Sequence, residues 1–564
     1  MAAAQNGASR QLTAAASKLK SAIFPLEFDG TSTPVKTVLF LLICAAWLLP
    51  GLLGHDPWKT EEAVTLGAVN GMLSSGDWVV PTLAGEPYLA RPPLYYLTAI
   101  AFVKTFSFLF PLHDAARLAT AFYMVLTLIF TGLAGIALYG GRFGRVTVMI
   151  LIGNLGLLIR SHEMNSDIAL LCGFAIALYG MVLGRTRFAL GGALLGTGIG
   201  IGFMSRGLIA PLISGTIALL LPALFRDLRS RGLWLFYGSA LLASLPWLLL
   251  WPLALWQRSP QLFDTWFWVN NVNLLADFTA RVDLLFYFHT LPWYAWPSLP
   301  LALWTLWEGG KRGLRRKEIQ LPLLAFLVML LFLSLSPLPR EAGTMPMLLP
   351  LTLLAAAGID SLRRGAASAL DWFGTMTFGL FSALLWLGWL AMVSGKPDAA
   401  ARSLREYHPG FLFEFDPIPF VFALALTLVW LIAITRSRRS NRRAIVNWTA
   451  GITTFWMLAM TLWLPFVDAG RSYRFMINEL HAALPAQYDC VATQGIGESQ
   501  RALLDYFASI RTQQVPIGRD TRCAFLLDQG TAKIDPLIGN AWKLRWEGSR
   551  PGDRTERYRL YERT

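Results

Sequence analysis

The apolar stretch VKTVLFLLICAAWLLPGLL occupies residues 35–53 and decides how the rest of the chain is interpreted. It ends in Gly54-His55-Asp56-Pro57 and lacks the small-residue cleavage site of a signal peptide, so we expect a retained membrane helix. Similar runs recur along the 564 residues, of which 55% are hydrophobic and 15% charged. Soluble domains carry about 25% charged residues. The sequence therefore predicts an α-helical polytopic membrane protein.

The net charge of +14 would suggest a nucleic-acid partner in a soluble protein. Here the positive-inside rule explains it, because nineteen Lys and Arg residues fall in short loops that we expect to be cytoplasmic. These loops are 142–145, 185–187, 226–231, 311–317, 363–364 and 436–443. We therefore expect contact with membrane lipids and no nucleic-acid partner.

Residues 92–110 are apolar and long enough to cross a membrane, yet a crossing there would invert every later basic loop. We therefore predict that this segment lies along the outer interface, with Lys104 and the Tyr95-Tyr96 pair at headgroup depth. About thirteen spans follow, at 36–53, 116–139, 146–160, 167–184, 188–204, 208–225, 233–256, 286–307, 320–337, 344–359, 371–393, 417–435 and 446–466. The predicted divisions are a cytoplasmic segment 1–35, a membrane domain 36–466 with a periplasmic loop 54–115, and a periplasmic domain 467–564.

The tail from residue 467 changes to mixed polar sequence. Short β-rich runs and the periodic stretch Ser499–Ile510 predict a small α/β domain of strands with one helix. Cys490 and Cys523 are the only cysteines expected outside the membrane, where an oxidising periplasm permits a disulfide between them. The sequence does not give their separation, so the pairing stays open. Cys44 and Cys172 are expected to pack inside spans.

Three motifs follow the first span in order: Glu61-Glu62, then Ser75-Gly76-Asp77-Trp78-Val79-Val80-Pro81, then Arg91-Pro92-Pro93-Leu94-Tyr95-Tyr96. In these motifs the chain resembles the bacterial polyprenyl-phosphate-sugar glycosyltransferases of the GT-C fold. That group includes protein O-mannosyltransferase relatives and the lipid A aminoarabinose transferases. Further matches run through residues 36–466: Asp167 in the turn after the third span, Arg206-Gly207, Pro246-Trp247, and Arg340 before Leu349-Pro350.

The resemblance implies a GT-C fold with periplasmic juxtamembrane helices in the bacterial inner membrane, its active site facing the periplasm. It implies transfer of a sugar from undecaprenyl phosphate, with inversion, to a periplasmic acceptor. A glycolipid such as lipid A is the leading acceptor, and a protein hydroxyl or a growing glycan is the alternative. A lipid or sugar transporter is the competing class, but the acids and arginines singled out here fall at outer span ends and not at the bilayer midplane.

A hydroxyl acceptor needs a carboxylate to take its proton. Glu61 is the candidate by motif spacing, Asp56 is the alternative, and Asp167 is expected to be a second, orienting carboxylate. Asp56-Pro57 also fits the start of a helix, and Glu61 also fits a solvated helix face. The family usually has Asp at the position of Glu61, so the assignment of the base between Glu61 and Asp56 stays open.

The departing phosphate needs cations, and guanidinium groups bind phosphate oxygens bidentately. Arg91, Arg206 and Arg340 are the predicted donor-phosphate ligands, with Lys59 as a weaker candidate. Snorkelling to lipid headgroups is the alternative explanation for these arginines.

The substrate pocket is expected to use aromatic and amide side chains from the loop 257–285, unless these form an interfacial aromatic belt. The predicted pocket residues are Trp268, Asn270, Asn271, Asn273, Glu62, Tyr88, Tyr95, His162 and Glu163. No Cys/His spacing is typical of a zinc site, so no essential metal is predicted. A divalent cation held by His55 and His289 with a carboxylate stays open.

Overall fold

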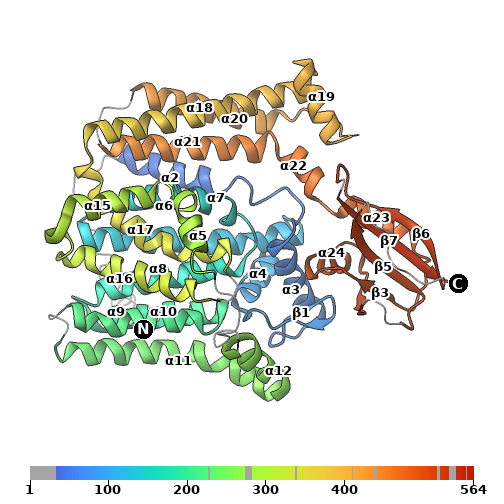
Figure 1. Ribbon diagram of the computed structural model, residues 1–564, viewed down its shortest axis with the longest axis horizontal. Coiled ribbons are helices and arrows are strands. Elements are labelled where there is room, and N and C mark those ends of the chain that lie inside the picture. Colours follow the sequence, from blue (N-terminus) through green and yellow to red (C-terminus); the bar gives the residue numbers. More distant parts are fainter. Residues whose placement is uncertain are drawn as a thin grey trace, which may run out of the picture.

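The computed structural model describes residues 34–225, 229–273, 283–336, 339–409, 411–436, 441–516, 521–531, 541–553 and 555–564. The predicted cytoplasmic segment therefore lies outside the described residues, apart from its last two positions. Long helices pack side by side and form one body, and a small sheet lies beyond one end of them (Figure 1).

The helices of this body follow the predicted spans closely. They are α2 (Pro34–Leu48), α5 (Leu112–Tyr139), α6 (Phe143–Ile152), α7 (Leu155–Arg160), α8 (Ser166–Leu183), α9 (Phe188–Arg206), α10 (Ile209–Leu224), α11 (Gly232–Arg258), α14 (Phe286–Tyr294), α15 (Ser298–Gly313), α16 (Lys317–Ser334), α17 (Met345–Gly358), α18 (Arg364–Ser394), α20 (Pro417–Arg436) and α21 (Asn441–Thr461). Shorter elements join them: α12 (Pro260–Asp264), the π-helix η2 (Thr265–Asn273), the 3-10 helices η3 (Glu341–Thr344) and η4 (Ile359–Ser361), and α19 (Asp398–Tyr407).

Eight of the described helices are long and apolar enough to cross a membrane, or nine if α21 and the bent segment after it form one span. The other four predicted spans correspond to α2, α6 with α7, α10, and α14 with α15. These helices are shorter; the ten residues of α6, for example, extend only about 15 Å against a hydrocarbon core of about 30 Å. Thirteen spans therefore stay a prediction.

The core of the body is α8, in which every residue is buried. Its sequence, SDIALLCGFAIALYGMVL, is apolar on all sides after the first turn, which is the composition of a helix surrounded by other helices. It packs against α5 and α9, and also against α17. The one acidic side chain of α8, Asp167, is thereby fixed at the end of the body that faces the sheet.

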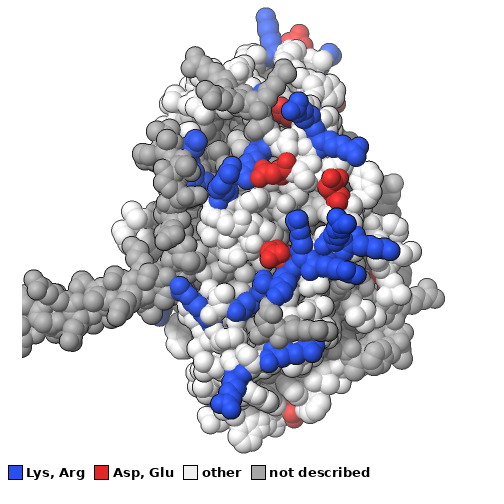
Figure 2. Space-filling view, turned by 90° about the vertical axis from the view of Figure 1, so that its left-hand side faces the viewer, with Lys and Arg blue, Asp and Glu red and all other residues white. Residues whose placement is uncertain are grey.

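Described parts of the predicted basic loops gather at the opposite end, whereas residues 226–228 and 437–440 of these loops lie outside the described residues. Figure 2 looks at the left-hand face of Figure 1 and shows many Lys and Arg side chains with few acids between them. The loops between α5 and α6, between α8 and α9, and between α15 and α16 lie on this side (Figure 1). This arrangement agrees with the charge-based topology.

The segment between α2 and α5 forms a compact unit at the sheet end. It contains α3 (Glu61–Ser75), the two-stranded hairpin of β1 (Thr82–Leu83) and β2 (Glu86–Pro87), and α4 (Leu94–Phe106). The 13 residues of α4 extend about 20 Å, which is shorter than a span. The headgroup depth of Tyr95 and Tyr96 stays a prediction, but the two side chains do not face lipid. Their side chains are 0% and 1% exposed because α4 turns them onto α5 and the core.

The tail begins with α22 (Leu464–Arg471) and α23 (Arg474–Ala483) and continues as a five-stranded mixed sheet in the order β4-β3-β5-β7-β6. The strands are β3 (Val491–Gln494), β4 (Thr512–Gln514), β5 (Phe525–Thr531), β6 (Trp542–Gly548) and β7 (Glu556–Arg563), with α24 (Glu498–Ala508) between β3 and β4. The strands and α24 match the predicted strands and helix, but α23 is a second helix that the prediction of one helix in the tail did not include. A disulfide joins Cys490 and Cys523, whose Cα atoms are 5.0 Å apart.

The C-terminal domain contacts the membrane body through α24, which packs on α3. The buried Arg501 on α24 pairs with Glu86 at 2.9 Å. On the same helix, the Tyr506 hydroxyl and His113 Nδ1 lie 2.9 Å apart. The start of α3 is thereby enclosed between the membrane helices and the sheet.

Candidate active site

Five predicted residues from five separate segments meet at this enclosed end. Glu61 begins α3, Arg91 precedes α4, Asp167 begins α8, Arg206 ends α9 and Arg340 precedes η3. Asp167 is held in place from the backbone, because the Asn165 side chain accepts a hydrogen bond from the Asp167 N–H at 2.8 Å and caps the helix.

The chain turns sharply after Arg206 at Gly207, whose φ is +72°. The Asn271 Oδ1 accepts a hydrogen bond from the Leu208 N–H at 3.1 Å, and a Cβ on Gly207 would lie 1.9 Å from that oxygen. Only glycine fits both the backbone angle and the close contact. Asn271 therefore supports the end of α9, which carries Arg206, in addition to its predicted place near a pocket.

The inner part of the site is the cluster of Asp167, Arg206 and Arg91. The Arg206 Nη1 donates to Asp167 Oδ1 at 2.5 Å, and Arg91 Nη2 lies 3.7 Å from Asp167 Oδ2. The side chain of Asp167 is 2% exposed and that of Arg91 is 12% exposed. Asp167 Oδ2 is buried without a hydrogen-bond partner among the described residues. Two guanidinium groups therefore share one buried carboxylate.

The outer part of the site is the pair of Glu61 and Arg340, whose Oε1 and Nη1 atoms lie 3.3 Å apart. Their side chains are 32% and 43% exposed. This pair is open to ligands, in contrast to the buried Asp167 cluster. Tyr88 is close enough to Arg91, Glu61 and Arg340 for their charges to act on it; burial, the largest effect, raises the pKa of its phenol to about 12.

A second polar cluster adjoins Arg340. Glu341 Oε2 lies 3.8 Å from Arg160 Nη2, and Arg160 also donates to Glu163 Oε2 at 3.1 Å. Burial and the negative charge of Glu62 raise the pKa of the Glu163 carboxyl to about 7, although Arg160 acts against this rise. Arg340 and Glu341 thus attach one short segment to α3 and to the end of α7. Glu341 and Arg160 were absent from the predicted site, although the Arg340-Glu341 sequence offers a cue.

Glu62 has a different role from its neighbour Glu61. It is 2% exposed, and its Oε1 accepts from Arg117 Nε at 2.7 Å while its Oε2 accepts from the Trp58 N–H at 2.9 Å. Burial alone would raise the pKa of the Glu62 carboxyl, but the charge and hydrogen bonds of Arg117 lower it. Glu62 therefore does not line an open pocket, and the prediction that placed it there is corrected.

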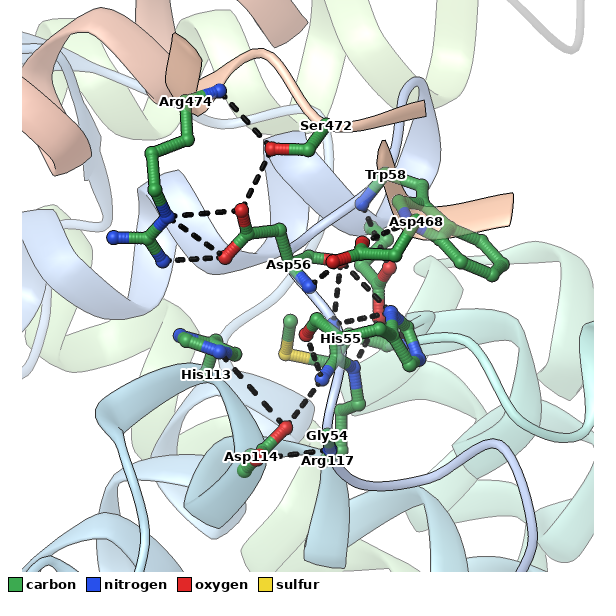
Figure 3. A network of polar contacts seen from close by, with 12 residues as sticks. Gly54, His55, Asp56, Trp58, His113, Asp114, Arg117, Asp468, Ser472 and Arg474 are labelled. Carbon is green, nitrogen blue, oxygen red and sulfur yellow. Dashed lines mark hydrogen bonds and ion pairs between the residues drawn. The ribbon is translucent and has the colours of Figure 1, made fainter. Parts of the chain in front are cut away.

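Arg117 itself is fully buried on α5 and holds the loop after α2 (Figure 3). It donates to Asp114 Oδ1 at 2.6 Å, to the His55 carbonyl at 2.8 Å and to the Asp56 carbonyl at 3.0 Å. Five donors in a rigid fork suit this task of holding several acceptors at once.

Asp56 attaches that loop to the tail (Figure 3). Its carboxylate accepts from the Ser472 hydroxyl at 2.6 Å and from two nitrogens of Arg474, one of them Nε at 2.9 Å. Asp468, on α22, accepts from the Asp56 N–H at 3.0 Å and from Trp58 Nε1 at 2.9 Å. Both carboxylate oxygens of Asp56 are therefore bonded to Ser472 and Arg474, which links the loop after α2 to the start of α23. Asp56 does not cap α3.

Lys59 points away from the five-residue cluster. Its ammonium lies 2.5 Å from Glu556 Oε1 in β7, so it links the start of α3 to the sheet. The structure thus separates Lys59 from the predicted phosphate ligands.

Several predicted pocket residues have structural contacts instead. The Tyr95 hydroxyl bonds to Thr120 at 2.6 Å, and His162 is held between the Leu158 and Trp47 carbonyls at 2.6 and 2.7 Å. Burial lowers the pKa of His162 to about 4, against the opposing effect of the two carbonyl groups. Apolar packing around the two rings explains why the prediction of a pocket role for Tyr95 and His162 was wrong.

The loop after α11 lies beside the arginine segment. Asn270 Nδ2 donates to the Leu89 carbonyl at 3.1 Å, two residues before Arg91. Trp268 is 51% exposed and Asn273 is also exposed, so both are accessible to ligands or to lipid. The loop therefore braces the site through its amides.

His55 and His289 do not form a metal centre in the described part of the chain. His55 Nδ1 lies 2.8 Å from the Asp56 carbonyl and Nε2 lies 3.0 Å from that of Gly51, while His289 is exposed on α14. The described residues contain no group of three or more His, Cys, Asp and Glu side chains suited to holding a metal ion.

Comparisons with known proteins give consistent relatives. An undecaprenyl phosphate-alpha-4-amino-4-deoxy-L-arabinose arabinosyl transferase of Serratia proteamaculans is 26% identical over 490 residues, covering 83% of this chain and 81% of that protein. The transferase of the same name from Pseudomonas aeruginosa strain LESB58 is 29% identical over 445 residues, covering 75% and 74%. No protein-family model matches the chain.

The fold is also that of a solved structure. The crystal structure of ArnT from Cupriavidus metallidurans bound to undecaprenyl phosphate superposes with a TM-score of 0.67 at 15% identity, over 93% of this chain and 98% of that one. Its apo form gives a TM-score of 0.66. These likenesses establish the expected GT-C type of fold.

Proposed function

We propose that this chain, a distant relative of the aminoarabinose arabinosyl transferases with their fold, transfers a sugar from undecaprenyl phosphate to an acceptor outside the bacterial inner membrane. The observation that carries the proposal is the meeting of Arg91, Arg206 and Arg340 with Glu61 and Asp167 at one end of the helical body. The basic face at the other end supports an orientation with this site in the periplasm.

The three arginines bind the phosphate of the donor lipid in this proposal. Three guanidinium groups face two carboxylates, so the five side chains carry one net positive charge before a phosphate arrives. Arg340 is exposed and Arg206 is one-fifth exposed, so both are open to phosphate oxygens. Planar guanidinium forks stabilise a phosphate that regains negative charge as the anomeric bond breaks.

Glu61 is the proposed general base for a hydroxyl acceptor. Asp167 is enclosed between two arginines and Asp56 is bonded to Arg474 and Ser472, which leaves Glu61 as the accessible carboxylate of the three. One attack on the anomeric carbon from the side opposite the phosphate inverts its configuration. If the acceptor is a phosphate that is already ionised, Glu61 orients the acceptor and removes no proton.

The leading acceptor is a glycolipid such as lipid A, and a protein hydroxyl or a growing glycan is the alternative. We further propose that residues 36–466 form the catalytic membrane domain with about thirteen spans and that residues 467–564 form a periplasmic domain. Every predicted span contains a helix in the structure, which supports this count.

The test is transfer by the purified protein in lipid vesicles that contain an undecaprenyl-phosphate sugar and lipid A. Mass spectrometry of the lipids identifies the product, and native mass spectrometry measures retention of undecaprenyl phosphate. We expect Arg206→Ala to retain at least tenfold less undecaprenyl phosphate than wild type. Arg402→Ala, an exposed arginine of α19, is the matched control. Wild-type protein that neither retains the lipid nor transfers sugar would refute the proposal.

A further inference from the structure

A cavity of about 490 Å³, broadly open to solvent, lies at the seam between the start of α3 and the C-terminal sheet. It is lined by Lys59, Thr60, Val64, Gly495, Gly497, Glu498, Ser499, Gln500 and Gln529. One wall consists of Lys59, Thr60 and Val64 at the start of α3, and the other wall belongs to α24, β5 and the loop between β3 and α24. In Figure 1, α3 and α24 lie next to each other at this seam. The volume is in the range that holds a small ligand, about 300–1,000 Å³.

The cavity lies where the topology of the sheet favours ligand binding. β3 has parallel neighbours on both sides: the chain leaves β3 through α24 to reach β4, while β5 lies on the other side of β3. Such a reversal opens a crevice at the carboxyl ends of the strands, where ligands bind in open α/β sheets. Gly495 follows β3 there with a φ of +69°, and a Cβ at this position would approach the Gln529 carbonyl to 3.1 Å.

Several polar groups of the cavity lining lack partners. Gln529 Oε1 is buried, and among the described residues it has no hydrogen-bond partner. The Thr60 hydroxyl does not cap α3, at whose N-terminus it stands. Glu498 is exposed, and within the described part of the chain it forms neither an ion pair nor a hydrogen bond. An amide oxygen buried without a hydrogen bond is unfavourable, and a rotation of the partly exposed Gln529 amide would let a ligand hydroxyl donate to it.

The charges favour a hydroxyl-rich ligand over an anion. The N-terminus of α24 and Lys59 would suit a phosphate, but Lys59 is paired with Glu556 at 2.5 Å. Glu498 places a free carboxylate in the first turn of the same helix. An approaching phosphate would meet that negative charge, whereas vicinal hydroxyls can donate to Glu498 and to Gln529 Oε1.

We propose that this cavity binds the saccharide part of the acceptor, with Gln529, Glu498 and Thr60 as ligands. Tyr88 is close enough to both Glu498 and Glu61 for their charges to act on it, so a saccharide held at Glu498 lies near the Glu61 carboxylate and can present an attached group to it. This inference rests on the proposed function for the identity of its ligand as the acceptor. The binding of a saccharide can be tested without any turnover.

The test uses the full chain in detergent and the lipid A disaccharide with its acyl chains and phosphates removed, observed by saturation-transfer NMR. Inorganic phosphate is titrated in parallel. We expect the saccharide to bind, and Gln529→Ala to weaken it at least tenfold. Gln514→Ala, an exposed glutamine on the edge strand β4 outside the cavity lining, should bind like wild type. Thr60→Val serves as a second variant should Gln529→Ala fold poorly.

Turnover supplies an independent readout. In the vesicle assay, Gln529→Ala should raise the KM for lipid A at least tenfold while the KM for the donor stays within twofold. Loss of transfer in wild type with saccharide binding intact would refute the proposed function and leave the cavity assignment standing. The cavity assignment is refuted if the saccharide does not bind wild type, if Gln529→Ala binds it normally, or if phosphate alone competes for the cavity.

Discussion

At the scale of single residues, two adjacent glutamates have opposite surroundings. Glu61 keeps about a third of its side chain exposed beside Arg340, while Glu62 is buried against Arg117. The helix geometry explains the difference, because neighbouring residues point about 100° apart around α3. The adjacent pair therefore divides into a carboxylate accessible to substrate and one that holds the fold.

Glu61→Gln should lower the transfer rate about 10²- to 10⁴-fold while the midpoint of thermal unfolding stays unchanged, because the amide cannot accept the acceptor proton. Glu62→Gln should lower the free energy of unfolding by about 3 kcal/mol, since it leaves Arg117 buried with only Asp114 as counter-charge. Initial rates and unfolding curves of both variants decide this. A loss of less than tenfold in Glu61→Gln would exclude a role as base.

At the scale of elements, the loop between α2 and α3 is held from two sides. Arg117 of α5 binds its carbonyl groups, while Ser472 and Arg474 bind the carboxylate of Asp56 (Figure 3). Burial would raise the pKa of Asp56, but the hydrogen bonds of Arg474 and Ser472 lower it below the usual value. A carboxyl with a lowered pKa stabilises the folded state at neutral pH, and that contribution is lost as the pH falls through the folded-state pKa.

Asp56→Asn should therefore destabilise the protein by about 1–2 kcal/mol at pH 7. This loss is smaller than for a fully buried ion pair because Arg474 is partly exposed. The difference between wild type and variant should shrink towards zero as the pH falls below about 4. Thermal unfolding of both proteins from pH 7 to pH 3.5 measures it. Asp398→Asn, on the exposed first turn of α19, should give a small difference that does not vary with pH. A constant difference for Asp56→Asn would contradict the tether.

At the scale of the whole molecule, charge separates the two ends of the helical body. Basic loops cover one end (Figure 2), and the Glu61, Asp167 and arginine cluster lies at the other, under the sheet. The cavity at the seam needs both parts, because Lys59 and Thr60 come from one and Gln529 from the other. A chain without its C-terminal sheet would therefore keep the arginines but lose one wall of that cavity.

Labelling of single cysteines with a membrane-impermeant maleimide tests this orientation. Phe108→Cys, in the exposed turn after α4, should react in intact spheroplasts, because we predict that residues 92–110 do not cross the membrane. Arg312→Cys, in the basic last turn of α15, should react only after permeabilisation. Unsubstituted protein gives the background of Cys44 and Cys172. Labelling of both substituted positions from the same side would overturn the topology.

The sequence by itself determined the helical membrane class, the position of nearly every helix, the gathering of basic loops at one end and the strands of the tail. Those features follow from local hydropathy and charge, which can be evaluated without knowing which residues pack together in the folded protein. It also named Glu61, Arg91, Asp167, Arg206 and Arg340. Only the tertiary structure decided the uses of Glu62, Asp56, Lys59 and His162, because their partners Arg117, Arg474, Glu556 and Trp47 lie far away in the chain. Burial and pairing across such distances depend on how helices and sheet pack, and no local pattern records that.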